Sequence, residues 1–432
     1  MESKGMTLAI VLLVVGLAVG AGVGYYAMPP KIVSTTNTVT VTEYKRPLEG
    51  KTIKIGFIAS STTDLETNQP LHKQIMEPDM NAYATRLGYG VKFDWLIDDA
   101  TGLANVHLEK VQSFKSMGVT VFQGGLWSSQ ALGSVGYCNE NNMLMWSSSS
   151  TSPLAMIPND NLYRMCPTDL VQAPAIAEML WSYGIKAIVV IQRGDAWADG
   201  IYNILKPDFE AKGGVVLDKV RYAAEVTEWS SYLQTAENIL SAAVATYGAD
   251  RIAIELISFQ EGVNIITQAK DYPTVYGCKW FGSDGTSMTQ QFIDDAPTHA
   301  QKLSIYSTLA APASSEKYNT LYDRYFALLS QPFGYYSACS YDIGTVMMMS
   351  MFEKQSDAAK DIIALQAPIC YDTWGATGWC RLNADGDRYA GNYDIWGYGG
   401  TPVTNVHFGF YNGVNGQVTW DTANLGFTPL GP

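Results

Sequence analysis

The feature that most constrains the fold is a regular alternation of short apolar runs and amphipathic segments after residue 51. Eight apolar runs bounded by turn residues are expected to be β-strands: Thr52–Ser60, Val91–Ile97, Val119–Gly125, Met143–Ser148, Lys186–Gln192, Val215–Tyr222, Arg251–Ile257 and Cys278–Gly282. Segments with helical spacing lie between them: His72–Leu87, Ala104–Met117, Gln172–Tyr183 and Trp229–Thr246. Near-continuous apolar strands that alternate with amphipathic helices predict an α/β fold with parallel sheets covered on both faces.

The number of strand–helix units limits the architecture further. Eight units are too many for one small doubly wound sheet, which leaves an eight-stranded barrel or two successive open α/β domains. The helix-rich segment from Ser315 to Ser356 and the Gly- and Tyr-rich segment after it do not suit a barrel. Two lobes are therefore expected, and 432 residues give room for two or three domains.

Composition excludes two classes of protein. Hydrophobic residues make up 47% of the chain and charged residues 16%, which is enough apolar surface to build a core and rules out intrinsic disorder. The chain has 28 Lys and Arg against 41 Asp and Glu, so its formal net charge is −13, and it has no basic run. Nucleic-acid binding needs a basic surface and is not expected.

The N-terminal segment Met6–Met28 contains no charged side chain over 23 residues. A helix of that length rises far enough to cross a hydrocarbon core about 30 Å thick. We therefore predict a membrane anchor in 1–30, a Thr-rich tether in 31–50 and an extracellular body. A cleaved signal peptide is the alternative. A third possibility is cleavage after Lys4-Gly5, which resembles the short signals of some archaeal surface proteins and would keep the apolar helix.

The cysteines are even in number, which permits disulfides in an oxidising compartment. Three pairings are predicted, the first because a short Gly-containing loop joins its members: Cys370–Cys380, Cys138–Cys166 and Cys278–Cys339. No C-x-x-C pair occurs and the chain has only four histidines, so neither a zinc site nor a cofactor is expected.

Catalytic motifs are missing from the sequence. It contains no G-x-S-x-G nucleophile elbow, no H-E-x-x-H zinc motif and no G-x-x-x-x-G-K-[ST] phosphate loop. The calcium-like NADGDR stretch lacks a closing Glu at the required distance and is expected to be a turn. An enzyme is therefore not expected.

A series of motifs follows the predicted strands in order: IKIGFIAS, IDDATGLANVHLEKVQSFKSMGVTVFQGGLWSSQALGSV, MLMWSSSSTSPLA, LYRMCPTDLVQAPAIAEMLWSYGIKAIVVIQRGDAWADGI, FEAKGGVVLDKVRY, KWFGSDG, YSACSYDIG and GATGWCRLNADGDRYAGNYDIWGY. Together these motifs resemble the type I periplasmic-binding-protein family, in particular the branched-chain amino-acid and amide-binding receptors of ABC importers. The resemblance covers about residues 51–400.

The resemblance implies two Rossmann-like lobes with parallel sheets, joined by three crossings, with a ligand held between them. Lobe I would comprise 51–167 and 303–388, and lobe II 168–302 and 389–432. The crossings would lie near Cys166–Pro167, Ala300–Ser304 and Arg388–Asn392.

The resemblance also assigns ligand contacts in lobe I. Ser128 matches a Ser at a helix N-terminus that receives a ligand carboxylate, together with the free backbone N–H groups there. Thr151 matches a second hydroxyl that holds the carboxylate, and Ser149 matches a backbone carbonyl that accepts from an α-ammonium. Trp127 precedes Ser128 and would flank the ligand.

Lobe II supplies the remaining contacts. Trp197 and Phe259 occupy positions of aromatic residues that cover the ligand, so the pocket would suit an apolar or planar side group. Asp284 matches the acidic residue that pairs with the ligand ammonium. It follows a predicted strand directly, and clefts in open α/β sheets lie outside the carboxyl ends of the strands.

The function implied is that of an extracellular solute-binding protein. It would capture a small amino-acid-like ligand between its lobes and deliver it to the permease of an ABC importer. Two alternatives stay open, a structural surface-layer or filament component and a ligand-sensing receptor built on the same fold. Ligand-dependent melting would separate a binding protein from a scaffold.

Overall fold

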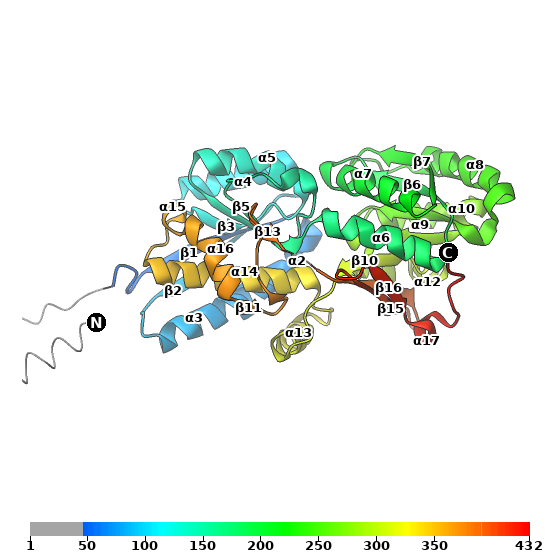
Figure 1. Cartoon of the computed structure of the whole chain (residues 1–432). Helices are drawn as coiled ribbons and strands as arrows, with labels where there is room; N and C mark the ends of the chain where they lie inside the picture. Colours follow the sequence, from blue (N-terminus) through cyan, green and yellow to red (C-terminus); the bar gives the residue numbers. More distant parts are fainter. Residues whose placement is uncertain (1–45, 390) are drawn as a thin grey trace, which may run out of the picture. The chain divides into compact units, whose positions relative to one another are not determined.

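The computed structural model describes residues 46–389 and 391–432 (Figure 1). The predicted membrane segment Met6–Met28 and most of the predicted tether lie outside the described residues. Within the described ranges, no helix is both long and apolar enough to cross a membrane.

Strands and helices alternate through the first three quarters of the described chain. The strands are β1 (Thr52–Ala59), β2 (Lys92–Asp99), β3 (Val121–Gln123), β4 (Leu144–Ser147), β5 (Leu162–Pro167), β6 (Ala187–Arg193), β7 (Val215–Tyr222), β8 (Ile252–Ile257), β9 (Lys279–Gly282), β10 (Tyr306–Ala310), β11 (Trp374–Gly375), β12 (Gly378–Trp379), β13 (Asp387–Arg388), β14 (Tyr393–Gly399), β15 (Thr404–Asn412) and β16 (Gln417–Trp420). The α-helices are α2 (Thr62–Pro70), α3 (Glu77–Arg86), α4 (Ala104–Ser116), α5 (Ser128–Glu140), α6 (Asp169–Tyr183), α7 (Ala196–Ala211), α8 (Ser230–Tyr247), α9 (Gly262–Ala269), α10 (Pro273–Gly277), α11 (Gln290–Asp295), α12 (Pro297–Leu303), α13 (Glu316–Leu329), α14 (Tyr335–Lys354), α15 (Ala359–Ile362), α16 (Gln366–Asp372) and α17 (Thr422–Leu425). A π-helical segment, η1 (Leu71–Met76), and the 3₁₀ turns η2 (Pro153–Ala155), η3 (Ala249–Arg251), η4 (Asp284–Thr286) and η5 (Ile363–Leu365) complete the list.

The first lobe is built on a six-stranded sheet with the order β13-β5-β4-β3-β1-β2, and its strands pair in parallel. Helices cover both faces. On one face α4 and α5 bury Phe114 and Val135, and on the other η1, α3 and α14 bury Met76 and Met347. This arrangement is the doubly covered parallel sheet that the apolar runs predict.

The second lobe is built on an eight-stranded sheet with the order β16-β15-β14-β10-β9-β8-β6-β7. The strands β6 to β10 pair in parallel, whereas β14, β15 and β16 pair antiparallel. The Gly- and Tyr-rich tail therefore extends this sheet, and its last helix, α17, packs against β15.

The chain passes between the two sheets three times. It leaves the first sheet after β5, returns after β10, and leaves again after β13. The second crossing comes later than the boundary at 303, because Tyr306–Ala310 pairs with β9 and β14 and so belongs to the second lobe.

The eight predicted strands are confirmed as β1 to β4 and β6 to β9, with ends that differ by at most two residues. The four predicted helices correspond to η1 with α3, α4, α6 and α8. Sequence patterns missed β5 and β10. The sequence of β5, LYRMCP, carries a charged residue and a proline, which break an apolar run.

The predicted disulfides are not formed: all six cysteines lie in the described residues, buried and unpaired, Cys370 and Cys380 among them. The loop from Cys370 to Cys380 is closed instead by the β11–β12 hairpin, and the backbone N–H of Cys380 donates to the carbonyl oxygen of Thr373 at 3.0 Å. Members of the other two predicted pairs lie in different hydrophobic clusters.

One buried acid in the second sheet gives a test of the core. Glu255 on β8 is fully buried, and within the described residues neither carboxylate oxygen has a hydrogen-bond partner. Burial holds the pKa of Glu255 well above its usual value. The folded state therefore keeps a proton that the unfolded state releases, so this group lowers stability as pH rises above about 4.5.

Glu255→Gln should therefore raise the melting temperature more at pH 8 than at pH 5. The gain should grow by about 1.4 kcal/mol for each pH unit between the unfolded and folded pKa values. Thermal melts of both proteins at the two pH values measure this difference. Glu353 is exposed, so Glu353→Gln is the control, and it should change the melting temperature by the same small amount at both pH values. The prediction is contradicted if the melting temperatures of wild type and Glu255→Gln differ by the same amount at pH 5 and pH 8.

Candidate functional site

A cavity of about 540 Å³ is lined by residues from both lobes. Its volume is in the range of small-molecule sites in proteins. The residues that line it include six of the seven predicted ligand contacts: Trp127, Ser128, Ser149, Trp197, Phe259 and Asp284. The seventh, Thr151, is buried and does not line the cavity.

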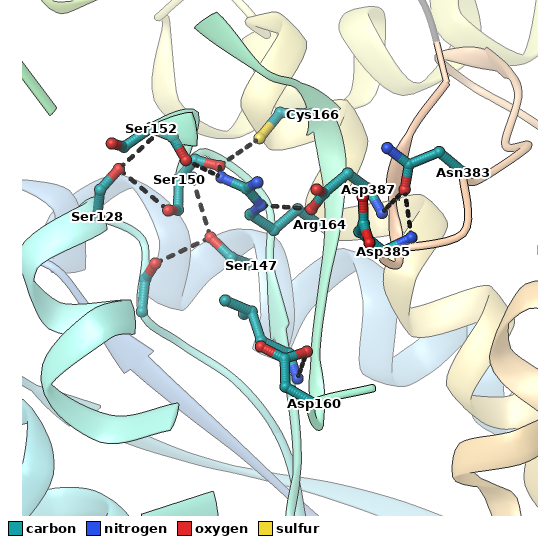
Figure 2. Close-up of polar contacts among 12 residues, drawn as sticks. Ser128, Ser147, Ser150, Ser152, Asp160, Arg164, Cys166, Asn383, Asp385 and Asp387 are labelled. Atoms are coloured by element: carbon teal, nitrogen blue, oxygen red, sulfur yellow. Dashed lines mark hydrogen bonds and ion pairs between the residues drawn. The ribbon is translucent and has the colours of Figure 1, made fainter. Parts of the chain in front are cut away.

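Ser128 is the first residue of α5 and lies in a network of serine hydroxyls (Figure 2). Its Oγ accepts hydrogen bonds from the Ser150 hydroxyl at 3.1 Å and from the Ser152 backbone N–H at 3.2 Å. The N–H groups in the first turn of a helix have no partner within the helix, and the helix dipole favours an anion there. This end of the cavity can therefore receive a carboxylate.

The loop that carries these serines is held by Arg164 of β5 (Figure 2). Its Nη1 donates to the carbonyl oxygens of Ser150, at 3.1 Å, and Ser152, at 2.7 Å. Its Nε pairs with Oδ1 of Asp387 at 2.5 Å, and the two side chains are only 0% and 1% exposed. A buried ion pair thus links β13 to the loop beside Ser128.

Three aromatic rings form a stack at the cavity. The Phe259 ring lies 4.5 Å from the Trp127 ring at an interplanar angle of 7°, and 4.3 Å from the Trp197 ring at 11°. Trp127 comes from the first lobe and the other two from the second. Arg193 contributes a cation–π contact, with its guanidinium 5.2 Å from the centre of the Trp127 ring. The stack supplies flat apolar surface on one side of the cavity.

Asp284 follows β9 and accepts two hydrogen bonds from other elements. Gln172 Nε2 of α6 donates to Oδ1 at 2.9 Å, and the Tyr336 hydroxyl of α14 donates to Oδ2 at 2.5 Å. Burial raises the pKa of Asp284, and the two hydrogen bonds act in the opposite direction. The carboxyl group is therefore fixed in position by residues from both lobes.

A second carboxyl group lies nearby. Asp169 begins α6, and its backbone N–H donates to the Thr151 carbonyl oxygen at 2.9 Å. Its side chain is fully buried, and neither oxygen has a hydrogen-bond partner within the described residues. Burial and the charge of Asp284 raise the pKa of Asp169. The fully buried Asp169 and the partly buried Asp284 together create a local preference for a cation.

Sequence reasoning missed Asp169, Gln172 and Tyr336. Asp169 comes two residues after β5 and Gln172 lies one turn further along α6, and polar residues at the carboxyl end of a parallel strand are candidates for a cleft. The position of these residues after a strand can be recognised only if LYRMCP is first identified as a strand. For Tyr336, at the start of α14, the local sequence carries no comparable signal.

Metal ligands do not cluster in the described part of the chain. There, no group of three or more His, Cys, Asp or Glu side chains is arranged to hold a metal ion.

Comparison with known proteins gives matches over most of the chain. The profile described as receptor family ligand binding region matches residues 79–401. An uncharacterized protein of Methanocaldococcus jannaschii is 27% identical over 410 residues, which is 89% of this chain and 95% of that protein.

Solved structures with a similar fold include two bacterial binding proteins. The leucine binding protein LivK of Thermotoga maritima has a TM-score of 0.69 and 16% identity, covering 84% of this chain and 99% of that one. The branched-chain amino acid transporter substrate binding protein LivJ of Streptococcus pneumoniae, in complex with isoleucine, has a TM-score of 0.66 and 18% identity, covering 82% and 99%. At these identities the likeness establishes the fold and confirms the predicted type I periplasmic-binding-protein architecture.

Proposed function

The chain belongs to the family of receptor ligand-binding regions, and from this premise we propose that it is a solute-binding protein for a small amino-acid-like ligand. The ligand is held between the two lobes and delivered to the permease of an ABC importer. The proposed ligand-binding residues are those of the predicted set that line the cavity: Trp127, Ser128, Ser149, Trp197, Phe259 and Asp284.

The observation that carries this proposal is the distribution of charge preference around the cavity. Ser128 and the N-terminus of α5 favour an anion, whereas the carboxyl groups of the partly buried Asp284 and the fully buried Asp169 favour a cation. A zwitterion with a carboxylate and an α-ammonium satisfies both preferences. A ligand with the carboxylate alone would leave the buried acids without a partner, which costs free energy.

The aromatic stack supports an apolar or planar side group on the ligand. Trp127 and Phe259 come from different lobes and are already in contact at 4.5 Å. A ligand side chain would pack against these rings or insert between them. Leucine, isoleucine and phenylalanine are therefore the first compounds to test.

A thermal-shift screen tests the proposal directly. A compound at 100 times its dissociation constant should stabilise the protein by about 2.7 kcal/mol, which raises the melting temperature measurably. We expect the shift with apolar amino acids, and only a small shift with 4-methylpentanoate, which lacks the ammonium, or 3-methylbutylamine, which lacks the carboxylate. Equal shifts with leucine and 4-methylpentanoate would contradict a zwitterion site.

The same screen separates the proposal from its alternatives. A structural surface-layer or filament component would melt at one temperature with every compound. A ligand-sensing receptor would bind ligand as well, and it would differ by associating with a signalling protein rather than with a permease.

The location of the protein is part of the proposal. The uncharged segment Met6–Met28 would anchor the chain in the cell membrane, with 31–50 as a tether and the body outside the cell. Protease added to intact cells should then degrade the body, and a body that stays protected until lysis would overturn this placement.

A further inference from the structure

A buried arginine lies against the ring stack of Trp127, Phe259 and Trp197. Arg193 is the last residue of β6 in the second lobe and is 8% exposed. Its guanidinium lies 5.2 Å from the centre of the Trp127 ring and 5.4 Å from the centre of the Phe259 ring. Arg193 does not line the cavity, so it can act on a ligand only through these rings.

Two ion pairs fix the guanidinium within the second lobe. Nε of Arg193 lies 3.0 Å from Oδ2 of Asp195, and Nη1 donates to Oε1 of Glu261 at 2.9 Å. The side chains of the two acids are only 12% and 16% exposed. The planar guanidinium presents several donors in a rigid fork, so two acids on different loops hold it in one orientation. Its position is therefore set before any contact with the first lobe is made.

The same two acids lie next to the rings that the second lobe contributes to the stack. Oδ1 of Asp195 accepts from the backbone N–H of Trp197 at 3.1 Å and caps α7. Glu261 precedes α9 and comes two residues after Phe259. Arg193 thus ties together the two chain segments that carry Trp197 and Phe259.

The contact between Arg193 and Trp127 crosses from one lobe to the other. Trp127 belongs to the first lobe, at the start of α5 and directly before Ser128. A cation within about 6 Å of the centre of an indole ring is attracted to the ring face, and the attraction is larger where water is excluded. Separation of the lobes breaks this contact, whereas the ion pairs to Asp195 and Glu261 lie within the second lobe and stay. The contact therefore favours the closed arrangement, in which the rings of the two lobes touch.

We propose that Arg193 is a positioning residue that latches the two lobes in the closed arrangement through the face of Trp127. The consequence for binding rests on the proposed function, in which the ligand enters between the lobes. A smaller closed fraction weakens every ligand by the same factor, because apparent affinity scales with the fraction of binding-competent protein. Loss of Arg193 should therefore weaken leucine and phenylalanine equally and leave the ratio of their affinities unchanged.

The latch is tested without any ligand by a distance measurement between the lobes. Spin labels are attached to the full chain at Glu140→Cys on α5 and Asn203→Cys on α7, two exposed positions, while the six native cysteines are buried. Pulsed EPR should show that the ratio of short to long label distances falls about tenfold in Arg193→Gln, equivalent to about 1.4 kcal/mol. Arg193→Lys keeps a cation and should lose less. Unchanged distances in Arg193→Gln would overturn the proposal, as would a parent protein that shows only the long distance.

Two further variants separate the latch from a general loss of stability. Glu261→Gln removes an ion pair of Arg193 but keeps the cation at Trp127, so it should lower the melting temperature and leave the label distances unchanged. Arg221→Gln removes another arginine of the second lobe, 45% exposed and paired with Asp199 of α7, and should change neither distances nor ligand affinity. If Glu261→Gln opens the lobes as much as Arg193→Gln, Arg193 acts only within the second lobe and the proposal is overturned.

Calorimetry with leucine and phenylalanine completes the test. An affinity ratio that changes in Arg193→Gln would show that Arg193 selects between ligands, which contradicts a latch. If neither amino acid binds the parent protein, the proposed function is contradicted, and the label distances still decide whether Arg193 holds the lobes together.

Discussion

Asp284→Ala should weaken the binding of an amino-acid ligand by at least about a hundredfold. The carboxyl group of Asp284 is partly buried, lines the cavity and is oriented by Gln172 and Tyr336. If the ligand ammonium meets this group, its removal strands a charge in a poorly hydrated site, which costs on the order of 3–5 kcal/mol. Each 1.4 kcal/mol is a factor of ten in the dissociation constant. Calorimetry with the ligand found by thermal shift measures the loss.

Two other variants provide comparisons for the loss of ligand affinity in Asp284→Ala. Asp295→Ala removes an exposed carboxylate that lines the same cavity, and it should change affinity by less than about threefold. Ser128→Ala removes one hydrogen bond to the ligand carboxylate, worth roughly 1.5–3 kcal/mol, so its loss should be the smaller of the two site variants. An unaltered affinity in Asp284→Ala would show that the ammonium binds elsewhere or that the ligand has none.

Asp387→Ala should reduce the free energy of unfolding by about 3–5 kcal/mol, because it leaves the Arg164 guanidinium buried without its ion-pair partner. The side chains of this pair are 0% and 1% exposed. The guanidinium also donates to the carbonyl oxygens of Ser150 and Ser152, so the loop beside Ser128 should lose order as well. Equilibrium unfolding in urea measures the stability change.

The control is the ion pair between Lys206 and Glu210 on α7, whose side chains are each 40% exposed. Glu210→Ala should cost only about 0.3–0.5 kcal/mol, since exposed pairs one helical turn apart contribute little. Replacing both members of the buried pair, Arg164→Met with Asp387→Leu, should recover much of the loss. If Asp387→Ala costs no more than Glu210→Ala, the buried pair does not hold this edge of the first sheet.

Strands buried on both faces are the part of the fold that sequence patterns predict well. The predicted strand Lys186–Gln192 is largely a run of apolar and β-branched residues, and β6 (Ala187–Arg193), which is buried along its whole length, lies within one residue of it. Short strands that carry a functional residue are harder to predict. β5 contains Arg164, whose charge is compensated by Asp387, more than 200 residues away in the chain. The pattern of residues around Arg164 cannot show that a distant aspartate pairs with its charge.

The same limit applies to the candidate site. Ser128 and Asp284 follow predicted strands closely, so their convergence at one cavity follows from the parallel topology. Tyr336 reaches Asp284 only because α14 packs in the first lobe while β9 lies in the second. Tertiary packing, rather than spacing along the chain, sets that contact.

The disulfide prediction failed for a related reason. A short loop between two cysteines is compatible with a bridge, but a β-hairpin closes such a loop equally well. In this chain Trp374 pairs with Trp379 across β11 and β12. Burial raises the pKa of the Cys380 thiol to about 11, so the thiolate that disulfide exchange requires is scarce at neutral pH.

The ring stack of Trp127, Phe259 and Trp197 gives the protein an intrinsic optical reporter. Phe259 lies between two indoles that belong to different lobes. A rotation that separates the lobes parts Trp127 from Phe259 and exposes that indole to water, while Trp197 stays covered by the same phenyl ring. The emission maximum of Trp127 should therefore shift to longer wavelength on opening. In a variant in which the other tryptophans except Trp197 are replaced by phenylalanine, the lobe movement can be followed without an attached dye.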